Sequence, residues 1–377
     1  MIKVLYISHE ADEVLGSTLS LVNHLHALRD NVVPLIVLPR EGRPADYLRQ
    51  LGYEVIVVPF KLNVAPERLM WLKFLPRLLW DGWANHRACQ ALLPLIRQRG
   101  IQLIHSNSSV TLLGHQLAAG RLPHIWHLRE FQDLDFGLQP FCGWSRLKAR
   151  ILSSSAVIAI TQAILDHYIA PADRDPKRHL VINDAVRSLD EISVADRQPY
   201  LLFCGKVIPA KGAETALQLF AGVAAAHPEL TLQYVGTVDA AYQQLLIGKA
   251  SEMGIADRIR FAGFQTDIRP YMQHASALLM CSRNEAQGRV TIEAMFYGTP
   301  VIAMAAGGTL EIVEHEGNGL LFNTVDEGIA QLSRLLGDSA LADGLIRGGH
   351  HTASTRFSEE GYRSQLLALY SQIINNR

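Results

Sequence analysis

The sequence lacks an excess of charge of either sign. Its 35 lysines and arginines stand against 36 aspartates and glutamates, which gives a formal net charge of -1 and a pI near 7.0. A chain this close to neutral carries no overall field that attracts nucleic acid or an anionic membrane, so either interaction would need a local patch. We therefore expect no nucleic-acid partner.

Paired cysteines and long apolar runs are also missing. Cys89, Cys142, Cys204 and Cys281 are far apart and form no CxxC pair, so neither a disulfide framework nor a zinc site is indicated. We expect reduced, mostly buried thiols. Met1–Ser8 reads as a buried strand rather than a secretory signal, and no apolar run approaches the roughly 20 residues that span a bilayer. These absences favour the cytoplasm as the compartment.

Length and composition favour two α/β domains. Of the 377 residues, 49% are hydrophobic and 19% charged, enough for two cores in domains of under about 200 residues each. Short apolar strands alternate with helical segments, which predicts parallel, doubly wound sheets. The expected strands are Ile2–Ile7, Val32–Val37, Val55–Val58, Ile101–His105, Ile125–His127, Ala156–Ile160, Tyr200–Cys204, Leu232–Val235, Ile259–Phe261, Ala277–Met280, Val301–Ala303 and Gly319–Phe322. The expected helices include Pro44–Leu51, Ser108–Ala119, Thr161–Tyr168 and Gly212–Ala225.

A change of character near residue 184 divides the chain. Asp184–Tyr200 is mixed polar and charged without sustained periodicity, so we interpret it as an interdomain linker. One Rossmann-like domain then covers residues 1–183 and a second covers residues 184–358. In open parallel sheets, ligands bind outside the carboxyl ends of the strands. Two such sheets facing a central cleft predict an enzyme whose chemistry lies on the loops that follow strands.

The segment Cys281–Pro300, CSRNEAQGRVTIEAMFYGTP, places two glutamates around the start of a helix. Glu285 lies in the loop after a strand, and Glu293 lies inside the helix. Amides from Gly288 to Thr291 at the helix N-terminus would suit a phosphate, and the two carboxylates could accept hydrogen bonds from sugar hydroxyls. The alternative is that Glu285 is a solvated loop residue and Glu293 a surface helix residue.

The whole string resembles a family signature. Glu285 and Glu293, with seven residues between them, are similar to the EX7E motif of GT-B glycosyltransferases of family 4, and the resemblance continues through Gly307–Val313 and Gly317–Phe322. In that family the first glutamate contacts hydroxyls of the donor sugar, and the second holds the ribose of the nucleotide. The resemblance therefore implies a donor site made of Glu285, Gln287, Gly288, Arg289, Val290, Thr291 and Glu293. Ala286–Gly288 departs from the commoner Gly-Phe-Gly, which leaves the sugar open.

Two lysines follow the first strand of the second domain. The turn from Gly205 to Gly212 contains Lys206 and Lys211, and ammonium groups beside helix amides suit a diphosphate. The family resembles this turn, with an arginine at the position of Lys206 and a lysine at that of Lys211, both binding the donor's phosphates. The resemblance thus adds Gly205, Lys206 and Lys211 to the donor site. The alternative is that both lysines are merely solvated.

In the first domain, the resemblance points to two loops that follow strands. Gly16 and Ser17 lie where the family has a glycine pair close to the donor phosphate and acceptor, although a helix cap by Ser17 or Thr18 would explain the segment equally well. His127 matches a family histidine that contacts the donor sugar near the reaction centre. Arg129 and Glu130 either pair with each other or address the acceptor. His127, Lys211 and Glu285 are the predicted catalytic residues.

Two further patterns concern metal binding and membrane contact. Asp133-Leu-Asp135 and Asp173-Arg-Asp175 match the DxD pattern, but neither follows a convincing apolar strand, and the resemblance implies metal-independent chemistry. We expect no metal and no other cofactor. Arg68–Trp80 interleaves basic, aliphatic and tryptophan residues, which suits peripheral contact with a membrane, although its apolar residues could simply pack on the domain. Pro76 interrupts a helix there.

The resemblance implies a retaining glycosyltransferase. It would move a hexosyl group from a nucleotide sugar to a glycan or lipid-linked acceptor, in cell-surface polysaccharide biosynthesis, and its final helix, within residues 359–377, would pack back on the first domain. The alternatives are a GT-B nucleotide-sugar epimerase and a non-catalytic nucleotide-sugar-binding protein. A Rossmann oxidoreductase is disfavoured because no GxGxxG follows the first strand.

Overall fold

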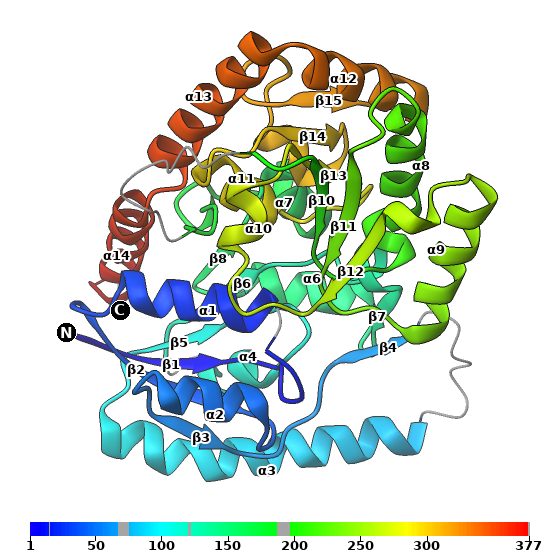
Figure 1. The fold of residues 1–377 in the computed structure, drawn as a ribbon. Helices are drawn as coiled ribbons and strands as arrows, with labels where there is room; N and C mark the ends of the chain where they lie inside the picture. The colour runs from blue at the N-terminus through cyan, green and yellow to red at the C-terminus, as the bar shows by residue number, and fades with distance from the viewer. Residues whose placement is uncertain (15, 67–74, 120–121, 187–196, 376–377) are drawn as a thin grey trace. The chain divides into compact units, whose positions relative to one another are not determined.

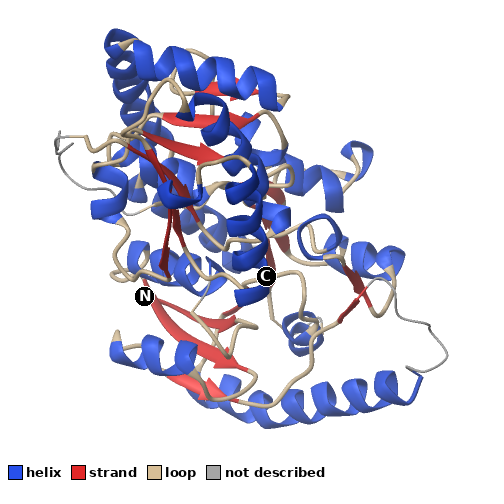
Figure 2. Cartoon of the chain, turned by 45° about the vertical axis from the view of Figure 1, so that its right-hand side comes forward, coloured by secondary structure: helices blue, strands red, loops and turns tan. Residues whose placement is uncertain are grey.

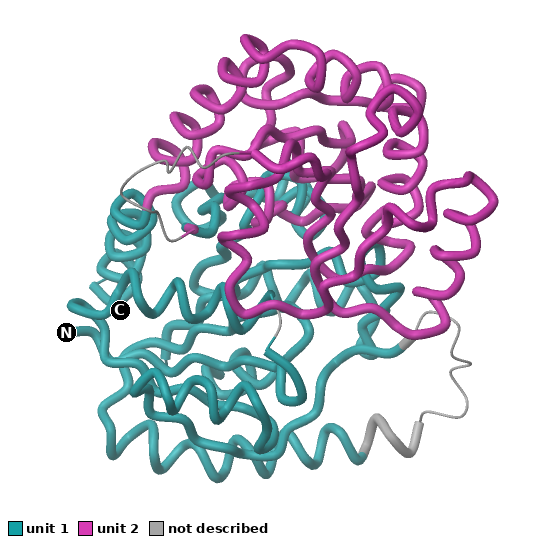
Figure 3. Tube along the Cα trace, viewed as in Figure 1, with its two compact units in different colours: residues 1–185, 359–377 teal, residues 186–358 magenta. Residues whose placement is uncertain are grey.

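The computed structural model describes residues 1–14, 16–66, 75–119, 122–186 and 197–375. The chain divides into two units, Met1–Ala185 with Glu359–Arg377, and Val186–Ser358 (Figure 3). Each unit contains a parallel sheet with helices packed against it (Figure 2). Within the described residues, no helix combines the length and the apolar character that crossing a bilayer requires.

The first unit is built on a sheet of strand order β3-β2-β1-β5-β6-β8-β9, in which all pairs are parallel (Figure 1). In that order the strands are Val55–Val57, Val32–Leu38, Ile2–Ile7, Leu103–Ser106, His124–Leu128, Ala156–Ala159 and His179–Val181. The helices are α1 Gly16–Ala27, α2 Arg43–Gln50, α3 Leu75–Arg99, α4 Leu113–Ala118, α5 Asp133–Phe136, α6 Trp144–Leu152, α7 Gln162–Tyr168 and α14 Glu359–Asn375, with a 3-10 turn η2 at Pro171–Asp173. A separate antiparallel pair joins β4 (Val64–Pro66) and β7 (Leu138–Pro140).

Alternation along β1 explains why this sheet is covered on both faces. Successive side chains of a strand point to opposite faces. Val4 and Tyr6 pack in a cluster with residues of α1, α2 and α14, whereas Leu5 and Ile7 pack in another with residues of α3 and α4. The C-terminal helix α14 therefore belongs to the core of the first unit, although almost the entire chain separates it from β1.

The second unit repeats the architecture with the order β12-β11-β10-β13-β14-β15, again all parallel. In that order the strands are Ile259–Gly263, Thr231–Val235, Tyr200–Cys204, Ala277–Met280, Val301–Met304 and Leu320–Phe322. The helices are α8 Ala213–Ala224, α9 Ala240–Glu252, α10 Arg269–Gln273, α11 Arg289–Phe296, α12 Val325–Gly337 and α13 Ser339–Arg356, with 3-10 turns η3 Pro209–Lys211, η4 Ala256–Arg258 and η5 Gly307–Glu311. Leu201 and Phe203 face α8, α9 and α12, and Leu202 faces α11.

The prediction of two parallel α/β domains is confirmed. Strands β1, β10 and β13 have the predicted bounds. The helix predicted over Ser108–Ala119 shrinks to α4, because Ser108 and Ser109 donate hydrogen bonds to the Glu130 carboxylate instead. The short strands β4, β7 and β9 have no counterpart among the predicted elements.

The linker predicted over Asp184–Tyr200 is shorter at both ends. Asp184 belongs to the first unit, where its buried carboxylate pairs with Arg129. At the other end, Arg197 donates to two backbone carbonyls of the second unit at 2.9 and 2.6 Å. Residues 187–196 lie outside the described residues. Burial, which composition does not reveal, is what separates these charged residues from a solvated linker.

Candidate functional site

A pocket marks the point at which the strand order of the second unit reverses. β10 lies between β11 and β13, so the loops after β10 and β13 diverge and leave a crevice at their carboxyl ends. A cavity of about 60 Å³ lies there. It is lined by Phe203, Cys204 and Gly205 at the end of β10, by Leu279, Met280 and Cys281 at the end of β13, and by Lys211, Glu285 and Val290.

Lys211 and Glu285, predicted as catalytic residues, meet at this pocket. The Lys211 Nζ lies 2.8 Å from Oε2 of Glu285, and their side chains are 32% and 13% exposed. Lys211 ends the turn η3, and Glu285 lies in the loop after β13, so 74 residues of sequence separate the pair. The sheet thus places a cation and a carboxylate together at a ligand-binding edge.

Glycines hold the backbone of these loops at close range. Gly212, which caps α8 with φ +76°, lies so near the chain after β13 that a Cβ there would come 2.1 Å from the Cys281 carbonyl oxygen. Gly308 donates its amide to the Glu285 carbonyl at 2.7 Å, and a Cβ on it would meet the Ala286 oxygen at 2.3 Å. Only glycine permits such approaches, so Gly307 and Gly308 of the predicted signature hold the Glu285 loop in place.

The predicted phosphate-binding helix is α11. Gly288 caps it with φ +84° and is followed directly by Arg289, Val290 and Thr291. The Thr291 amide already donates to the Gly288 carbonyl at 2.8 Å, so it is not the open donor that the sequence suggested. Earlier amides of the turn fit that role better. Gln287, also predicted at the site, is 3% exposed.

An arginine of the same helix, α11, holds the Glu293 carboxylate. Arg289 donates to Oε1 of Glu293 at 2.8 Å from Nη2 and at 3.2 Å from Nε, an i,i+4 pair whose side chains are 22% and 10% exposed. The two glutamates of the EX7E motif are therefore both ion-paired and largely buried. Neither is a solvated surface residue, which was the alternative interpretation.

Gly205 and Lys206 form the turn after β10. Gly205 has φ +131°, and its carbonyl oxygen would lie 1.9 Å from a Cβ on Gly236, so the turn packs tightly on the loop after β11. The Lys206 side chain is exposed. Lys206 therefore lies at the rim of this region, while Lys211 lines the pocket itself.

Two thiols at the pocket are not nucleophiles. Burial raises the pKa of Cys204 to about 12, with a smaller contribution from Glu293, and burial also raises the pKa of Cys281 far above its ordinary value. Both therefore remain protonated near neutral pH. All four cysteines are free, but only Cys281 is fully buried, whereas the sequence suggested mostly buried thiols.

In the first unit, the first turn of α1 is hydrogen-bonded to Glu10 and Asn107. The Thr18 amide donates to Glu10 at 2.8 Å, and its hydroxyl donates to the same carboxylate, so Thr18 does not cap the helix. Asn107 donates to the Ser17 carbonyl at 3.2 Å and to its hydroxyl at 3.3 Å. Gly16 is exposed, and a Cβ there would meet nothing within 4 Å. Glu10 and Asn107 therefore hold the first turn of α1, while Gly16 itself stays exposed.

His127 is fully buried in β6, next to a buried ion pair. Its Nδ1 lies 3.2 Å from Nη2 of Arg129, and its Nε2 lies 3.8 Å from Oδ1 of Asp184. Arg129 pairs with Asp184 and donates from Nε to Asn107 at 2.9 Å. Burial and the Arg129 charge hold the pKa of His127 well below its ordinary value, so the ring is neutral.

Glu130 and the DxD aspartates bind neighbours within the first unit. Glu130 accepts from the Ser108 hydroxyl and the Ser109 amide, both at 2.8 Å. Asp133 lies 3.2 Å from His167, and the Phe131 amide donates to Asp135 at 2.9 Å. Roles for Arg129 and Glu130 toward an acceptor stay predictions. So does the absence of a metal.

The predicted membrane segment Arg68–Trp80 lies largely outside the described residues, which omit 67–74. Its described end opens α3. There Trp80 is 59% exposed, with its ring centroid 5.0 Å from that of Trp83, which is 48% exposed. Arg87 lies over the Trp83 ring at 5.0 Å.

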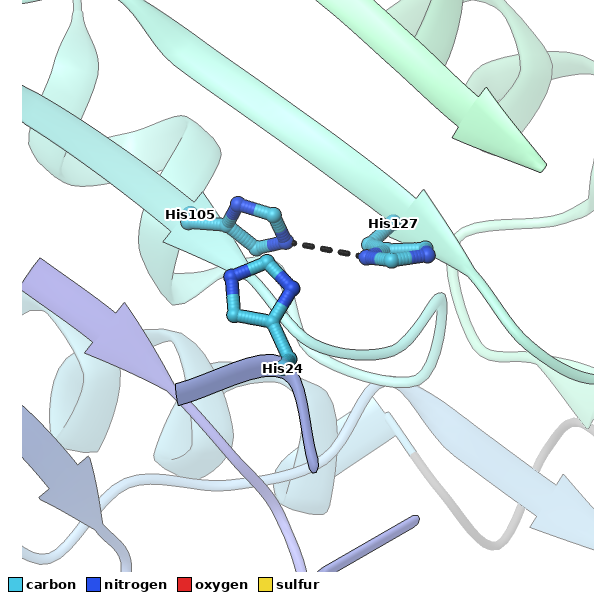
Figure 4. A group of neighbouring side chains, drawn as sticks. All are labelled: His24, His105 and His127. Carbon is cyan, nitrogen blue, oxygen red and sulfur yellow. Dashed lines mark hydrogen bonds between the residues drawn. The ribbon is translucent and has the colours of Figure 1, made fainter. Parts of the chain in front are cut away.

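Sequence reasoning missed three residues beside His127. Asp184 pairs with Arg129, and His105 and His24 pack against the His127 ring with centroids 5.2 and 6.0 Å away (Figure 4). The sequence around each of these three residues contains a feature that could have indicated it. Asp184 follows the carboxyl end of β9, His105 lies in a buried strand, and His24 occupies the apolar stripe of α1 between Leu21 and Leu25.

Two family models match the chain. The glycosyl transferase 4-like domain matches residues 17–184, and glycosyl transferases group 1 matches residues 187–351. Together they span most of both units. The chain belongs to the GT-B glycosyltransferases of group 1, family 4, as its motifs indicated.

Curated relatives match over part of their length. The lipopolysaccharide core biosynthesis glycosyltransferase LpsE of Rhizobium meliloti is 28% identical over 60% of this chain and 58% of its own length. LpsD of the same organism, which carries the same description, is 32% identical over 46% of this chain and 49% of its own. The chain therefore spans about half the length of these curated relatives.

Solved structures match over nearly the full length. HepE from Anabaena, solved with UDP and glucose, is 22% identical with a TM-score of 0.79, over 99% of this chain and 100% of that one. Sucrose-phosphate synthase from Thermosynechococcus elongatus is 19% identical with a TM-score of 0.72, over 100% of both chains. These similarities show that the fold is GT-B.

Proposed function

We propose that the protein is a glycosyltransferase that takes a hexosyl group from a nucleotide sugar bound at the pocket of the second unit. The observation that carries this proposal is the meeting of Lys211 and Glu285, 2.8 Å apart, at the strand-order reversal beside the start of α11. Family membership supports the class of reaction. The bound UDP and glucose of HepE support the class of donor.

Each charged group at the pocket has a distinct task in this proposal. Lys211 and, from the rim, Lys206 meet the charge of the diphosphate, together with the first amides of α11. Glu285 accepts hydrogen bonds from hydroxyls of the sugar. Glu293, oriented by Arg289, accepts from the ribose. Lys211 also contacts Glu285, so donor binding would replace part of that contact with one to phosphate.

Charge on the departing diphosphate governs the chemistry. The bond between the anomeric carbon and the diphosphate oxygen breaks, the acceptor oxygen bonds to the same face of that carbon, and the acceptor proton passes to the departing phosphate. Retention is thus proposed without an enzyme nucleophile, in keeping with the protonated state of Cys204. Fixed cations and amides stabilise the developing charge, each worth about 3 kcal/mol. We propose that no metal is required.

The acceptor is proposed to be a glycan or a lipid-linked glycan, in cytoplasmic assembly of a cell-surface polysaccharide. LpsE and LpsD, both described as enzymes of lipopolysaccharide core biosynthesis, support this choice. Exposed Trp80 and Trp83 on α3 fit the interleaved basic and aromatic segment that would meet the membrane carrying such an acceptor.

A donor screen tests the function. Thermal unfolding is followed with UDP-, GDP-, ADP- and dTDP-sugars, with and without EDTA, because a bound donor stabilises the folded state. The stabilising donor is then incubated with enzyme alone and with lipid-linked glycan acceptors. Transfer of the sugar to an acceptor supports the proposal, whereas conversion of the free donor to an epimer, or tight binding without any product, contradicts it.

A matched pair of variants locates the site. Lys211→Ala should lower transfer by at least about 100-fold, because one donor to the leaving group is lost. Lys249→Ala is the control, since it removes a Lys–Glu surface pair from the same unit, with Glu214 as partner. Equal activity in the two variants would contradict a phosphate role for Lys211.

A further inference from the structure

Three histidine rings and three tyrosine hydroxyls share one buried network in the first unit. His24 comes from α1, His105 from β5 and His127 from β6, and all three are buried (Figure 4). The hydroxyl groups belong to Tyr6 on β1 and to Tyr362 and Tyr370 on α14. Hydrogen bonds join these six side chains to one another.

Arg129 sets the direction of these hydrogen bonds, because a guanidinium can only donate. Its Nη2 lies 3.2 Å from Nδ1 of His127, so that nitrogen accepts. Burial and the Arg129 charge lower the pKa of His127, so the neutral ring carries a single proton. That proton sits on Nε2.

His105 can then take only one tautomer. Its Nε2 lies 3.1 Å from Nδ1 of His127, which already accepts, so Nε2 of His105 donates. Burial also holds the pKa of His105 well below its ordinary value, so its Nδ1 carries no proton. The Tyr370 hydroxyl, 2.7 Å away, donates to that nitrogen.

A second branch agrees with the first. Arg129 also hydrogen-bonds the Tyr362 hydroxyl, whose own proton then goes to Nδ1 of His24, 2.8 Å away. Burial also keeps His24 neutral, so its Nε2 donates, to the Tyr6 oxygen at 3.1 Å or to the Tyr370 oxygen at 3.2 Å. Both branches place the proton of each histidine on Nε2.

His127 ends the network with a donor that has no hydrogen-bond partner within the described residues. Its Nε2 is buried there, and Oδ1 of Asp184 lies 3.8 Å away, beyond hydrogen-bond distance. A neutral Nε2–H can donate to an oxygen of a ligand. It has no lone pair with which to remove a proton.

The same three rings could be taken for a metal site, since one nitrogen from each lies within 4.8 Å of the others. Two observations oppose that assignment. The Arg129 cation lies beside His127, and tyrosine hydroxyls donate into the Nδ1 lone pairs of His105 and His24. A positive ion would have to displace all of these contacts.

We propose that Tyr370 and His105 are positioning residues that hold His127 as its neutral Nε2–H tautomer, a hydrogen-bond donor rather than a proton acceptor. The effect of this tautomer on transfer rests on the proposed function. His127 then cannot serve as a general base, and the acceptor proton leaves by way of the departing phosphate.

NMR measures the tautomer of each histidine directly. The full-length protein is labelled with 15N at histidine, and two-bond 1H–15N correlations are recorded at pH 7.5, with His127 and His105 assigned from His127→Gln and His105→Gln. The expected result is an unprotonated Nδ1 in both rings. A His127 protonated on Nδ1 or on both nitrogens, or a spectrum that a metal chelator changes, overturns the proposal whether or not transfer is observed.

A tyrosine variant tests the positioning. Tyr370→Phe removes the hydrogen that fixes His105, so both rings should show mixed tautomers, and kcat should fall about fivefold with little change in donor KM. Tyr53→Phe is the matched control, a half-buried tyrosine packed on the same core outside the network. Wild-type tautomers in Tyr370→Phe, or equal losses of kcat in both variants, overturn the proposal. Correct tautomers in a wild-type protein that transfers no sugar would contradict only the proposed function.

Discussion

Mild acid should destabilise the first unit through its buried histidines. Burial, reinforced by Arg129, holds the pKa values of His24, His105 and His127 well below 6.5, and burial lowers that of His124 to about 3. In the unfolded chain these rings titrate near 6.5. Below that pH the unfolded state binds more protons than the folded state. The stability that depends on these neutral histidines is therefore fully present above pH 6.5 and is lost as the pH falls.

The magnitude follows from the number of buried rings. At pH 5.5, each histidine that stays neutral in the folded state lowers the free energy of unfolding by about 1.4 kcal/mol relative to neutral pH. The four rings together cost up to about 6 kcal/mol, which is comparable with the whole stability of an ordinary domain. The window from pH 7.5 to 5.5 keeps most carboxylates ionised, so histidines dominate the change.

Tryptophan fluorescence reports this unit selectively, because all five tryptophans of the sequence lie between residues 71 and 144. Urea unfolding curves at pH 7.5, 6.5 and 5.5 give the stability of the unit at each pH. The change of the unfolding free energy with pH, which we call the acid slope, gives the number of protons taken up on unfolding. His24→Gln should lower that number by about one. His86→Gln, an exposed histidine on α3, is the control and should leave it unchanged. Equal stability at pH 7.5 and 5.5, or an unchanged slope in His24→Gln, would refute the reasoning.

Three further predictions concern the second unit. Gly308→Ala would place a Cβ 2.3 Å from the Ala286 oxygen and shift the Glu285 loop, so donor affinity should fall at least about tenfold in a calorimetric titration. Gly344→Ala meets open space inside α13 and should instead raise the free energy of unfolding by about 0.5–1 kcal/mol in a urea curve. Arg289→Ala leaves Glu293 without its i,i+4 partner, so the KM for the donor should rise several-fold; a KM equal to that of the wild type would show that the pair does not orient Glu293.

Local sequence carries much of the candidate donor site. Glu285 and Glu293 lie within one strand–loop–helix segment, and Lys211 follows the first strand of its unit, so motif and periodicity suffice to place them. What the motif does not contain is their pairing. Lys211 meets Glu285 because β10 and β13 are neighbours in the sheet, a contact 74 residues apart that depends on topology.

The histidine network could not be predicted in this way. Tyr370 reaches His105 from 265 positions further along the chain, and only the packing of α14 on the first unit brings them together. The sequence near Asp184 is polar, which is typical of a linker, yet its partner Arg129 makes it a buried residue. Burial and long-range pairing decide both cases, and neither leaves a local pattern.

Calorimetric titration of the nucleotide sugar selected by the donor screen into the wild type, Lys211→Ala and Lys249→Ala tests the central claim most directly. The proposed donor site predicts one saturable site in the wild type and in Lys249→Ala, with a dissociation constant at least about tenfold higher in Lys211→Ala, because one contact between a cation and the diphosphate is lost. The same dissociation constant in all three proteins would contradict a donor site at the pocket of the second unit.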